Sequence, residues 1–264
     1  MGRLRADILL VERGLFPSRE RARAAILAGE VRVAGTRVTK AGELLAQDAE
    51  IQVAEKRRYV SRGGDKLAGA LDTFGLDPSG LRAIDVGAST GGFTDCLLQR
   101  GAASVCAVDV GYGQLAWSLR QDPRVDVHER TNIRNADTDA LGAPFDLVVA
   151  DVSFISLVTV LPALRALAGE SGQLVALVKP QFEAGKGRVG KRGVVREASV
   201  HAEVLHSVLA ALEQAGLAVR GATWSPIKGP EGNIEFWVWA SANGPASGVD
   251  PEVVVAAAHE SLGG

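Results

Sequence analysis

The sequence predicts an α/β protein with a seven-stranded, mostly parallel sheet whose last strand is antiparallel, preceded by a small α+β domain. In the larger C-terminal part, short apolar runs alternate with helix-type stretches, a pattern typical of parallel sheets covered on both faces. The last two apolar runs are separated only by "SPIKGPEGN", which is too short for a crossover helix and predicts an antiparallel pair. Residues 1–66 also differ in charge from the rest, with 14 Lys and Arg against 9 Asp and Glu.

The small domain is predicted at residues 1–59, with two short helices followed by short strands. Ser18 is a favourable N-cap for the second helix, and Gly29 can end that helix in the left-handed conformation. Ala34 and Gly35 lie between two alternating apolar runs and predict a hairpin. The charged, glycine-containing residues 60–66 are predicted to be a linker, and residues 67–264 the second domain.

Arginines of the second predicted helix lie mostly outside its apolar face. Arg19, Arg21 and Arg23 could therefore form a surface that binds phosphate groups. The ordinary interpretation is a solvated helix face, and charge alone favours it.

Each apolar run of the second domain is predicted to be a strand. They are predicted at residues 82–86, 104–110, 125–129, 145–151, 173–180, 217–224 and 234–240. Helices are predicted at residues 156–168 and 198–216, and residues 241–248 are predicted to link the sheet to a short C-terminal helix.

Overall composition is that of an ordinary globular protein, with 47% hydrophobic and 23% charged residues. The sequence has no apolar run long enough for a bilayer and no uninterrupted secretory core, so we expect a cytoplasmic protein without membrane contact. Its two cysteines predict neither a disulfide framework nor a zinc site, and no metal is expected. A monomer is the default expectation.

A glycine-rich turn, "GASTGG", follows the first strand of the second domain and leads into a helix. A P-loop is excluded because Phe93 occupies the position of its lysine. A dinucleotide site is disfavoured because the turn lacks the second glycine of that fingerprint. S-adenosylmethionine is the favoured ligand, and NAD remains the alternative.

Acidic residues end the first two strands of this domain and complete the predicted cofactor site. Asp109 is placed to accept from ribose hydroxyls, whereas Asp85 has an alternative interpretation as a turn former. The predicted cofactor-binding set is Asp85, Gly87, Ala88, Ser89, Gly91, Gly92 and Asp109.

Charged residues also follow or precede other strands at the same predicted edge. Asp151 and Lys179 end strands, Glu235 begins the antiparallel strand, and Lys66 lies in the approach to the domain. Such a set suits methyl transfer to a sugar hydroxyl, because one lysine can accept the proton while the carboxylates orient the amines and the ribose. We predict Lys179 as the base and Lys66 as the steering cation.

Two further segments have open interpretations. Phe154, three residues after Asp151, could stack on an extruded nucleobase or be buried in the core. Residues 185–192, "GKGRVGKR", resemble a P-loop but end in Arg192 instead of Ser or Thr, and we interpret them as a mobile basic loop.

Several blocks together resemble the TlyA-type ribosomal RNA methyltransferases, a family that also carries the name hemolysin A. The blocks, in chain order, are "SRGGDKLAGAL", "DVGASTGGFTDCLL", "DVGYGQLAWSLR", "ERTN", "VVADVSFISL", "LVKPQFE" and "GNIEFWVW". The resemblance implies an RNA-binding domain like that of small-subunit ribosomal protein four, joined to an FtsJ-like, Rossmann-like methyltransferase domain.

The same resemblance implies a function and its residues. It implies 2′-O-methylation of cytidine in large-subunit RNA and, in the longer subtype, in small-subunit RNA, with ribosomal RNA or ribosomal subunits as partners. The catalytic tetrad maps onto Lys66, Asp151, Lys179 and Glu235, and the base-stacking aromatic onto Phe154. The basic RNA-binding residues map onto Arg3, Arg5, Arg19 and Lys40. The pore that the name hemolysin implies has no support in the sequence.

Two rival functions remain open at this point. One is a non-catalytic RNA-binding assembly factor that has kept the fold. The other is a dehydrogenase, which would require a nicotinamide site and a proton-relay histidine; His201, His206 and His259 lie away from the expected strand ends.

Overall fold

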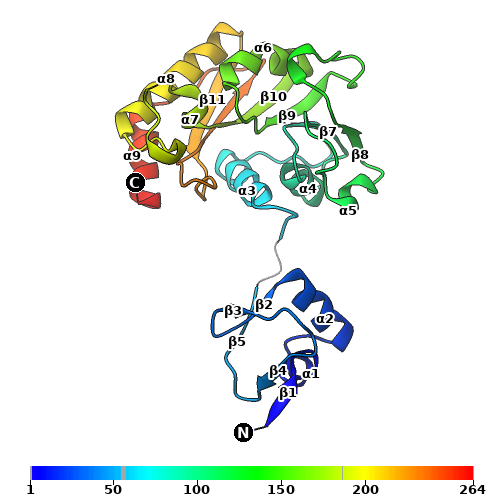
Figure 1. Ribbon diagram of the computed structural model, residues 1–264. Coiled ribbons are helices and arrows are strands. Elements are labelled where there is room, and N and C mark those ends of the chain that lie inside the picture. Colours follow the sequence, from blue (N-terminus) through cyan, green and yellow to red (C-terminus); the bar gives the residue numbers. More distant parts are fainter. Residues whose placement is uncertain (1, 55–57, 186, 264) are drawn as a thin grey trace. The chain divides into compact units, whose positions relative to one another are not determined.

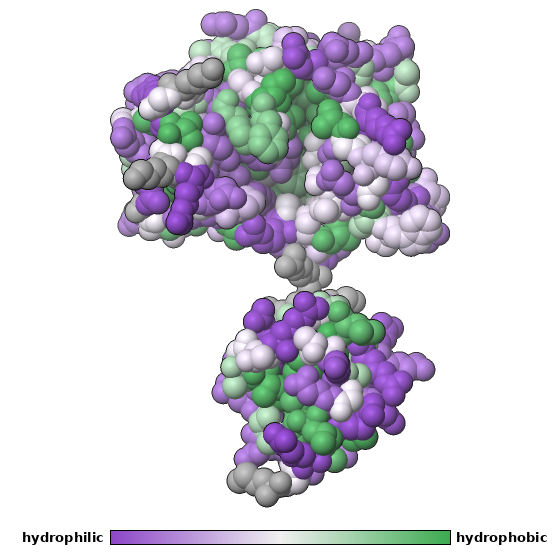
Figure 2. All heavy atoms as spheres, viewed as in Figure 1, coloured by the Kyte–Doolittle hydropathy of each residue, from purple (hydrophilic) through white to green (hydrophobic). Residues whose placement is uncertain are grey.

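The chain divides into two compact units, Met1–Arg57 and Arg58–Gly264, which are described separately below. The computed structural model describes residues 2–54, 58–185 and 187–263, with Lys191 by its backbone alone (Figure 1). Among these residues, no helix has both the length and the apolar composition needed to cross a membrane. Figure 2 shows hydrophilic side chains interspersed with apolar patches on the visible face of each unit.

The smaller unit contains two helices and two small sheets. Its elements are β1 (Arg3–Arg5), α1 (Ala6–Glu12), α2 (Arg19–Ala28), β2 (Val31–Val33), β3 (Thr36–Arg37), β4 (Leu44–Ala46) and β5 (Ile51–Val53). Strand β1 pairs with β4, and β2 lies between β3 and β5. All of these pairs are antiparallel.

Local signals in this unit are confirmed by the structure. The Ser18 hydroxyl accepts a hydrogen bond from the Arg21 amide at 3.3 Å, and Gly29 ends α2 with φ of 78°. Ala34 and Gly35, with φ of 47° and 79°, form the predicted turn between β2 and β3. Apolar side chains of both helices and of the strands form one core, as the helical spacing of Ala22, Ala25 and Ile26 predicts.

The larger unit is built on one sheet, whose described strands have the order β11-β12-β10-β9-β6-β7-β8. Their bounds are β6 (Arg82–Val86), β7 (Ser104–Val108), β8 (Val125–His128), β9 (Phe145–Ala150), β10 (Ala168–Val178), β11 (Ala218–Trp224) and β12 (Phe236–Ser241). Strand β12 is antiparallel to both of its neighbours, and β6 to β10 are mutually parallel. The predicted seven strands and the reversed last strand are therefore confirmed.

Helices cover both faces of this sheet (Figure 1). They are α3 (Arg62–Phe74), α4 (Gly92–Gln99), α5 (Trp117–Arg120), α6 (Leu157–Leu167), α7 (Pro180–Glu183), α8 (Ala198–Gln214) and α9 (Pro251–Leu262), with 3-10 turns at Ile133–Asn135 and Lys191–Gly193. Buried side chains of α6, α8 and α9 pack on one face, and those of α3, α4 and α5 on the other. This arrangement is the doubly wound fold, in which ligands bind beyond the carboxyl ends of the strands.

The residues predicted as a linker, 60–66, are placed differently by the structure. Residues 62–66 form the first turns of α3, and the Ser61 hydroxyl caps that helix by accepting from the Gly63 amide at 3.3 Å. The glycines are needed for close packing, because a Cβ at Gly64 would lie 2.2 Å from the ring of Tyr59. Composition alone suggested a linker, whereas these contacts make the segment part of the folded unit.

Candidate functional site

The four charged residues predicted at the sheet edge form two ion pairs, one buried and one half-buried. Lys66, on α3, donates from Nζ to Glu235 Oε2 at 2.5 Å, and the two side chains are 8% and 1% exposed. Lys179, directly after β10, forms an ion pair with Asp151, directly after β9. Each lysine is thus paired with one carboxylate.

Strand register explains why these residues meet. Antiparallel pairing of Val178 with Phe236 places Lys179 beside Glu235 at the next position. Parallel pairing of Ala176 with Ala150 brings Asp151 to the same edge. Burial raises the pKa of Glu235, while the nearby cations Lys66 and Lys179 oppose that rise.

Small residues let Lys66 reach this edge. The helix α3 packs closely on α4, since a Cβ at Gly92 would lie 2.2 Å from the Ser61 hydroxyl oxygen. A Cβ at Gly229 would lie 2.6 Å from Glu235 Oε1, so the loop before β12 also approaches the carboxylate closely. Side chains at these positions would displace one or other member of the Lys66–Glu235 pair.

A cavity of about 470 Å³ lies at the carboxyl ends of β6, β7 and β9, and Asp151 is the one of the four charged residues in its lining. Five residues of the predicted sites line it, namely Gly87, Ser89, Asp109, Asp151 and Phe154. Gly87 has φ of 89°, and a Cβ there would lie 2.3 Å from the Asp151 carbonyl oxygen. Asp109 accepts from the amides of Ser89 at 2.7 Å and Gly111 at 2.6 Å. The volume falls in the range of small-molecule sites.

Four residues of the predicted cofactor-binding set do not line the cavity. Ala88, Gly91 and Gly92 pack against other parts of the unit, and Asp85 is fully buried. Asp85 Oδ2 accepts from the amide of Thr94 at 3.0 Å and from its hydroxyl at 2.7 Å, which ties β6 to the first turn of α4. Burial raises the pKa of Asp85 to about 7. The assignment of these four residues to the cofactor stays a prediction.

Other cavity-lining residues were not predicted individually, although all of those named here except Ile133 lie in blocks that carry the resemblance. They come from loops after the strands and include Val110, Gln114, Thr131, Asn132, Ile133, Val152, Ser153 and Ile155. The Ser153 hydroxyl accepts a hydrogen bond from Lys179 Nζ at 2.8 Å. This bond connects the Lys179–Asp151 ion pair to a second residue of the cavity wall. The block "ERTN" contains two of these residues, but its local pattern does not reveal that they line the cavity.

Phe154 is displayed on the surface and is not buried in the core. Its side chain is 91% exposed, and its backbone has φ of 64°, which is unfavourable for a residue other than glycine. Its ring lies 5.3 Å from the ring of Phe182, measured between centroids. The interpretation of Phe154 as a core residue is therefore wrong.

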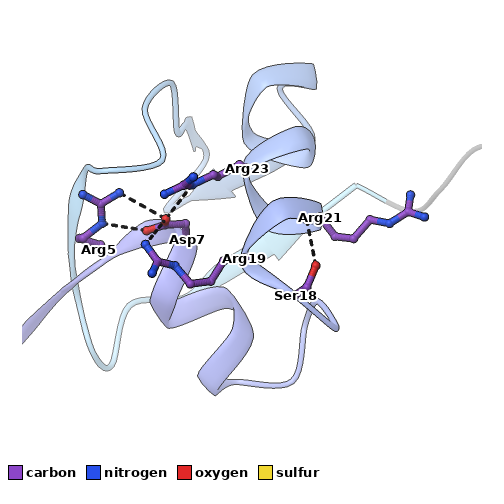
Figure 3. A network of polar contacts seen from close by, with 6 residues as sticks. All are labelled: Arg5, Asp7, Ser18, Arg19, Arg21 and Arg23. Atoms are coloured by element: carbon purple, nitrogen blue, oxygen red, sulfur yellow. Dashed lines mark hydrogen bonds and ion pairs between the residues drawn. The ribbon is translucent and has the colours of Figure 1, made fainter.

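A cluster of arginines surrounds one carboxylate in the smaller unit (Figure 3). Asp7, which is fully buried, accepts from Arg5 Nε at 3.0 Å, Arg19 Nη2 at 3.0 Å and Arg23 Nε at 3.1 Å. The three arginine side chains are each about half exposed, and Arg21 points away from them. The arginines, led by Arg5, hold the pKa of Asp7 well below its usual range.

The cluster carries an excess of positive charge at the surface. Three guanidinium groups share one carboxylate, and each keeps N–H groups that point away from Asp7. Lys40 is exposed in the loop whose Ala41 carbonyl accepts from the Asp7 amide at 3.1 Å. Arg3, also exposed, lies on β1 two residues before Arg5. The sequence pointed to Arg23 only as part of a charged helix face and did not single out Asp7, because the cluster depends on contacts between β1, α1 and α2.

Comparison with known proteins gives matches over both units. A family model described as FtsJ-like methyltransferase matches residues 59–242, and one described as S4 domain matches residues 4–51. The chain is 50% identical to the 16S/23S rRNA (cytidine-2'-O)-methyltransferase TlyA of Mycobacterium tuberculosis, over 90% of this chain and 89% of that protein.

Further relatives extend these matches. The 23S rRNA (cytidine-2'-O)-methyltransferase TlyA of Campylobacter jejuni is 35% identical over 70% of this chain and 72% of that protein. A solved Streptococcus thermophilus structure, described as that of a proposed hemolysin, superposes with a TM-score of 0.77 at 46% identity, covering 100% of this chain and 98% of that chain. These matches bear out the resemblance that the sequence blocks indicated.

Proposed function

Since this chain belongs to the TlyA family of ribosomal RNA methyltransferases, with an S4 domain and an FtsJ-like methyltransferase domain, we propose that it methylates the 2′-hydroxyl of cytidine in ribosomal RNA. The observation that carries the proposal is the pairing of Lys66 with Glu235 and of Lys179 with Asp151, together with the position of Asp151 in the cavity wall. These groups combine a proton acceptor with fixed charges next to a small-molecule site, which methyl transfer to a hydroxyl requires.

S-adenosylmethionine fits the residues of the cavity. The Asp109 carboxylate can accept from ribose hydroxyls, apolar Val110 and Ile133 can enclose a base, and Gly87 leaves room beside Asp151. When bound, the cofactor supplies a methyl group activated by its sulfonium.

The chain's own residues position the hydroxyl and remove its proton. We assign to the neutral amine of Lys179, formed when its ammonium releases a proton to solvent, the acceptance of the 2′-hydroxyl proton. Asp151 and Ser153 orient the nitrogen. Lys66, held by Glu235, supplies a fixed positive charge at the same edge. Much of the acceleration then comes from holding the nucleophile in line with the methyl group.

RNA contacts are proposed on both units. The exposed ring of Phe154 offers a stacking surface for the extruded target base. Arg3, Arg5, Arg19 and Lys40 offer cations for phosphate groups, and we add Arg23 to this set because it shares Asp7 with two of them. The relatives are named for both 16S and 23S rRNA in one case and for 23S rRNA in the other, and we propose 23S with 16S as the second target.

We further propose a monomer that acts in the cytoplasm. Both ion pairs and the cavity are formed by side chains of one chain, so no partner residue is required for the site. Ribosomal subunits, the proposed substrate, are cytoplasmic. Light scattering of the purified protein tests the oligomeric state.

The decisive experiment is transfer of labelled methyl groups to separated, unmethylated small and large ribosomal subunits. Reverse transcription at low nucleotide concentration then maps the modified ribose. We expect label at a cytidine ribose of the large subunit. If the protein binds S-adenosylmethionine and subunits but labels neither subunit, the proposal fails in favour of a non-catalytic assembly factor.

A further inference from the structure

The segments that follow β9 and β10 are fastened to each other along their length. Lys179 forms the ion pair with Asp151 and donates to the Ser153 hydroxyl at 2.8 Å. Three residues further along each segment, the Phe154 and Phe182 rings lie with their centroids 5.3 Å apart. The segment that carries Phe154 therefore takes its shape from residues 179–183.

Glu183 closes this set of contacts. Its carboxylate accepts from the Ser156 hydroxyl at 2.6 Å through Oε2 and from the Leu157 amide at 2.6 Å through Oε1. Leu157 is the first residue of α6, so Glu183 satisfies an amide that has no partner within the helix. A carboxylate at a helix N-terminus also has a favourable interaction with the helix dipole.

The backbone at Phe154 is strained, and the strain has to be maintained by its surroundings. A non-glycine residue with φ of 64° has an unfavourable backbone conformation, which persists when neighbouring contacts over-determine it. Phe154 lies between Ser153, held by Lys179, and Ser156, held by Glu183. Because the ring itself is 91% exposed, burial does not hold the ring in place.

We infer that Glu183 is a positioning residue for methyl transfer, which holds residues 153–157 in the strained conformation that presents the Phe154 ring to the target nucleobase. This role rests on the proposed function, in which Phe154 stacks on that base. Without the Glu183 carboxylate, the Ser156 hydroxyl and the Leu157 amide lose their acceptor, and the backbone at Phe154 is free to relax.

The first test does not depend on activity. Amide hydrogen exchange is compared in wild type, Glu183→Ala and Glu213→Ala, a control that removes an exposed glutamate from α8. We expect exchange in residues 153–158 to rise about tenfold in Glu183→Ala and to stay unchanged in the control. Unchanged exchange in Glu183→Ala overturns the inference, whatever the substrate proves to be.

The second test asks whether Glu183 acts through Phe154. Single-turnover methyl transfer is measured with saturating cofactor and subunits in Glu183→Ala, Phe154→Ala and the double variant. We expect Glu183→Ala to lower the rate about tenfold in the wild-type background and less than about twofold in the Phe154→Ala background. Equal losses in the two backgrounds would indicate a general structural role and overturn the inference.

The methyl-transfer rate of the conservative variant Glu183→Gln is the third test. Its amide oxygen can accept from Leu157, and its amide nitrogen can donate to the Ser156 hydroxyl. We expect it to restore most of the rate lost in Glu183→Ala, and a loss as large as that of alanine contradicts the inference. Wild-type protein that is inactive on both subunits refutes the proposed function, whereas the hydrogen exchange comparison still decides the role of Glu183.

Discussion

Lys66 Nζ lies 2.5 Å from Glu235 Oε2 although the two are 169 positions apart in the chain. A buried ion pair therefore joins α3 to the residue that directly precedes β12. Removing two charges from water costs about as much free energy as their attraction returns, so such a pair contributes little net stability. Breaking it is costly, because one charge then remains buried alone. The pair therefore determines where the ammonium is held more than how stable the fold is.

Removal of the Lys66 amine is expected to destabilise the protein through the remaining carboxylate. Lys66→Met should lower the free energy of unfolding by about 3 kcal/mol at pH 8. The loss should become smaller as the pH falls, because burial raises the pKa of Glu235 and a protonated carboxyl no longer leaves a buried charge unpaired. The double variant Lys66→Met/Glu235→Gln should recover most of this loss but no methyl transfer. Urea unfolding and the methylation assay measure the two effects, and a double variant as unstable as the single one would assign the loss to packing.

Replacement of Lys179 separates proton acceptance from charge. Lys179→Ala should reduce methyl transfer by about 100-fold or more, since general base catalysis is commonly worth that much, while the dissociation constant for S-adenosylmethionine changes less than about twofold. Lys179→Arg keeps the positive charge but cannot accept a proton at neutral pH. It should be as inactive as the alanine variant, and substantial activity in Lys179→Arg would show that charge alone is required. Calorimetry and single-turnover rates provide the measurements.

Neutralisation of Asp7 should weaken RNA binding even though it makes the protein more positive. In Asp7→Asn the charged acceptor that orients Arg5, Arg19 and Arg23 is lost, and the three guanidinium groups repel one another without it. We expect affinity for ribosomal subunits to fall about threefold to tenfold at 0.1 M salt.

The matched control is Asp48→Asn, which removes the same charge from an exposed position of the smaller unit. Filter binding over a range of salt concentrations should show unchanged or slightly tighter binding for this variant. Tighter binding by both variants would mean that total charge, and not the arrangement around Asp7, determines the affinity.

Asp85 is expected to make stability depend on pH. Its pKa of about 7 in the folded protein lies above the usual value of 3.8, so the folded state holds the proton more tightly than the unfolded chain. The stabilisation is complete below about pH 4 and is lost as the pH rises towards 7. Between pH 5 and pH 8, wild type should lose about 2 kcal/mol that Asp85→Asn does not lose.

The Asn variant keeps an oxygen that can accept from Thr94, so its hydrogen bonds are preserved. Chemical unfolding at several pH values makes the comparison, and parallel pH profiles for the two proteins would show that Asp85 does not titrate in this range. The dissociation constant for S-adenosylmethionine in the same variant tests the prediction that Asp85 contributes to the cofactor site.

Much of the larger unit could be predicted because its signals are local. Apolar runs that end in Asp109, Asp151 and Lys179 identify buried parallel strands, and the parallel order brings their carboxyl ends to one edge. The short loop before Glu235 predicts a reversed strand, which places that residue at the same edge. The residue types and their strand-end positions thus sufficed to propose Asp151, Lys179 and Glu235 together, whereas Lys66 lies on α3.

Other features depended on contacts that the sequence does not reveal. Residues 60–66 have the composition of a linker, but the packing of Gly64 on Tyr59 and of Gly92 on Ser61 makes most of them helical. The hydrogen bonds that Asp85 accepts from Thr94, and its burial, also depend on packing that the sequence does not reveal. The sequence likewise did not distinguish between burial and exposure for Phe154.

The sequence by itself determined the alternation of strands and helices, the cap at Ser18, the turn at Gly35 and the chemical groups at the strand ends. These features follow from side-chain periodicity and from interactions between residues near one another in the chain. Only the tertiary structure decided that Lys66 pairs with Glu235, that Asp7 gathers three arginines and that Glu183 holds the Phe154 segment. Such pairings depend on how distant segments pack, because a charged side chain becomes committed to one partner only when burial removes water as the alternative.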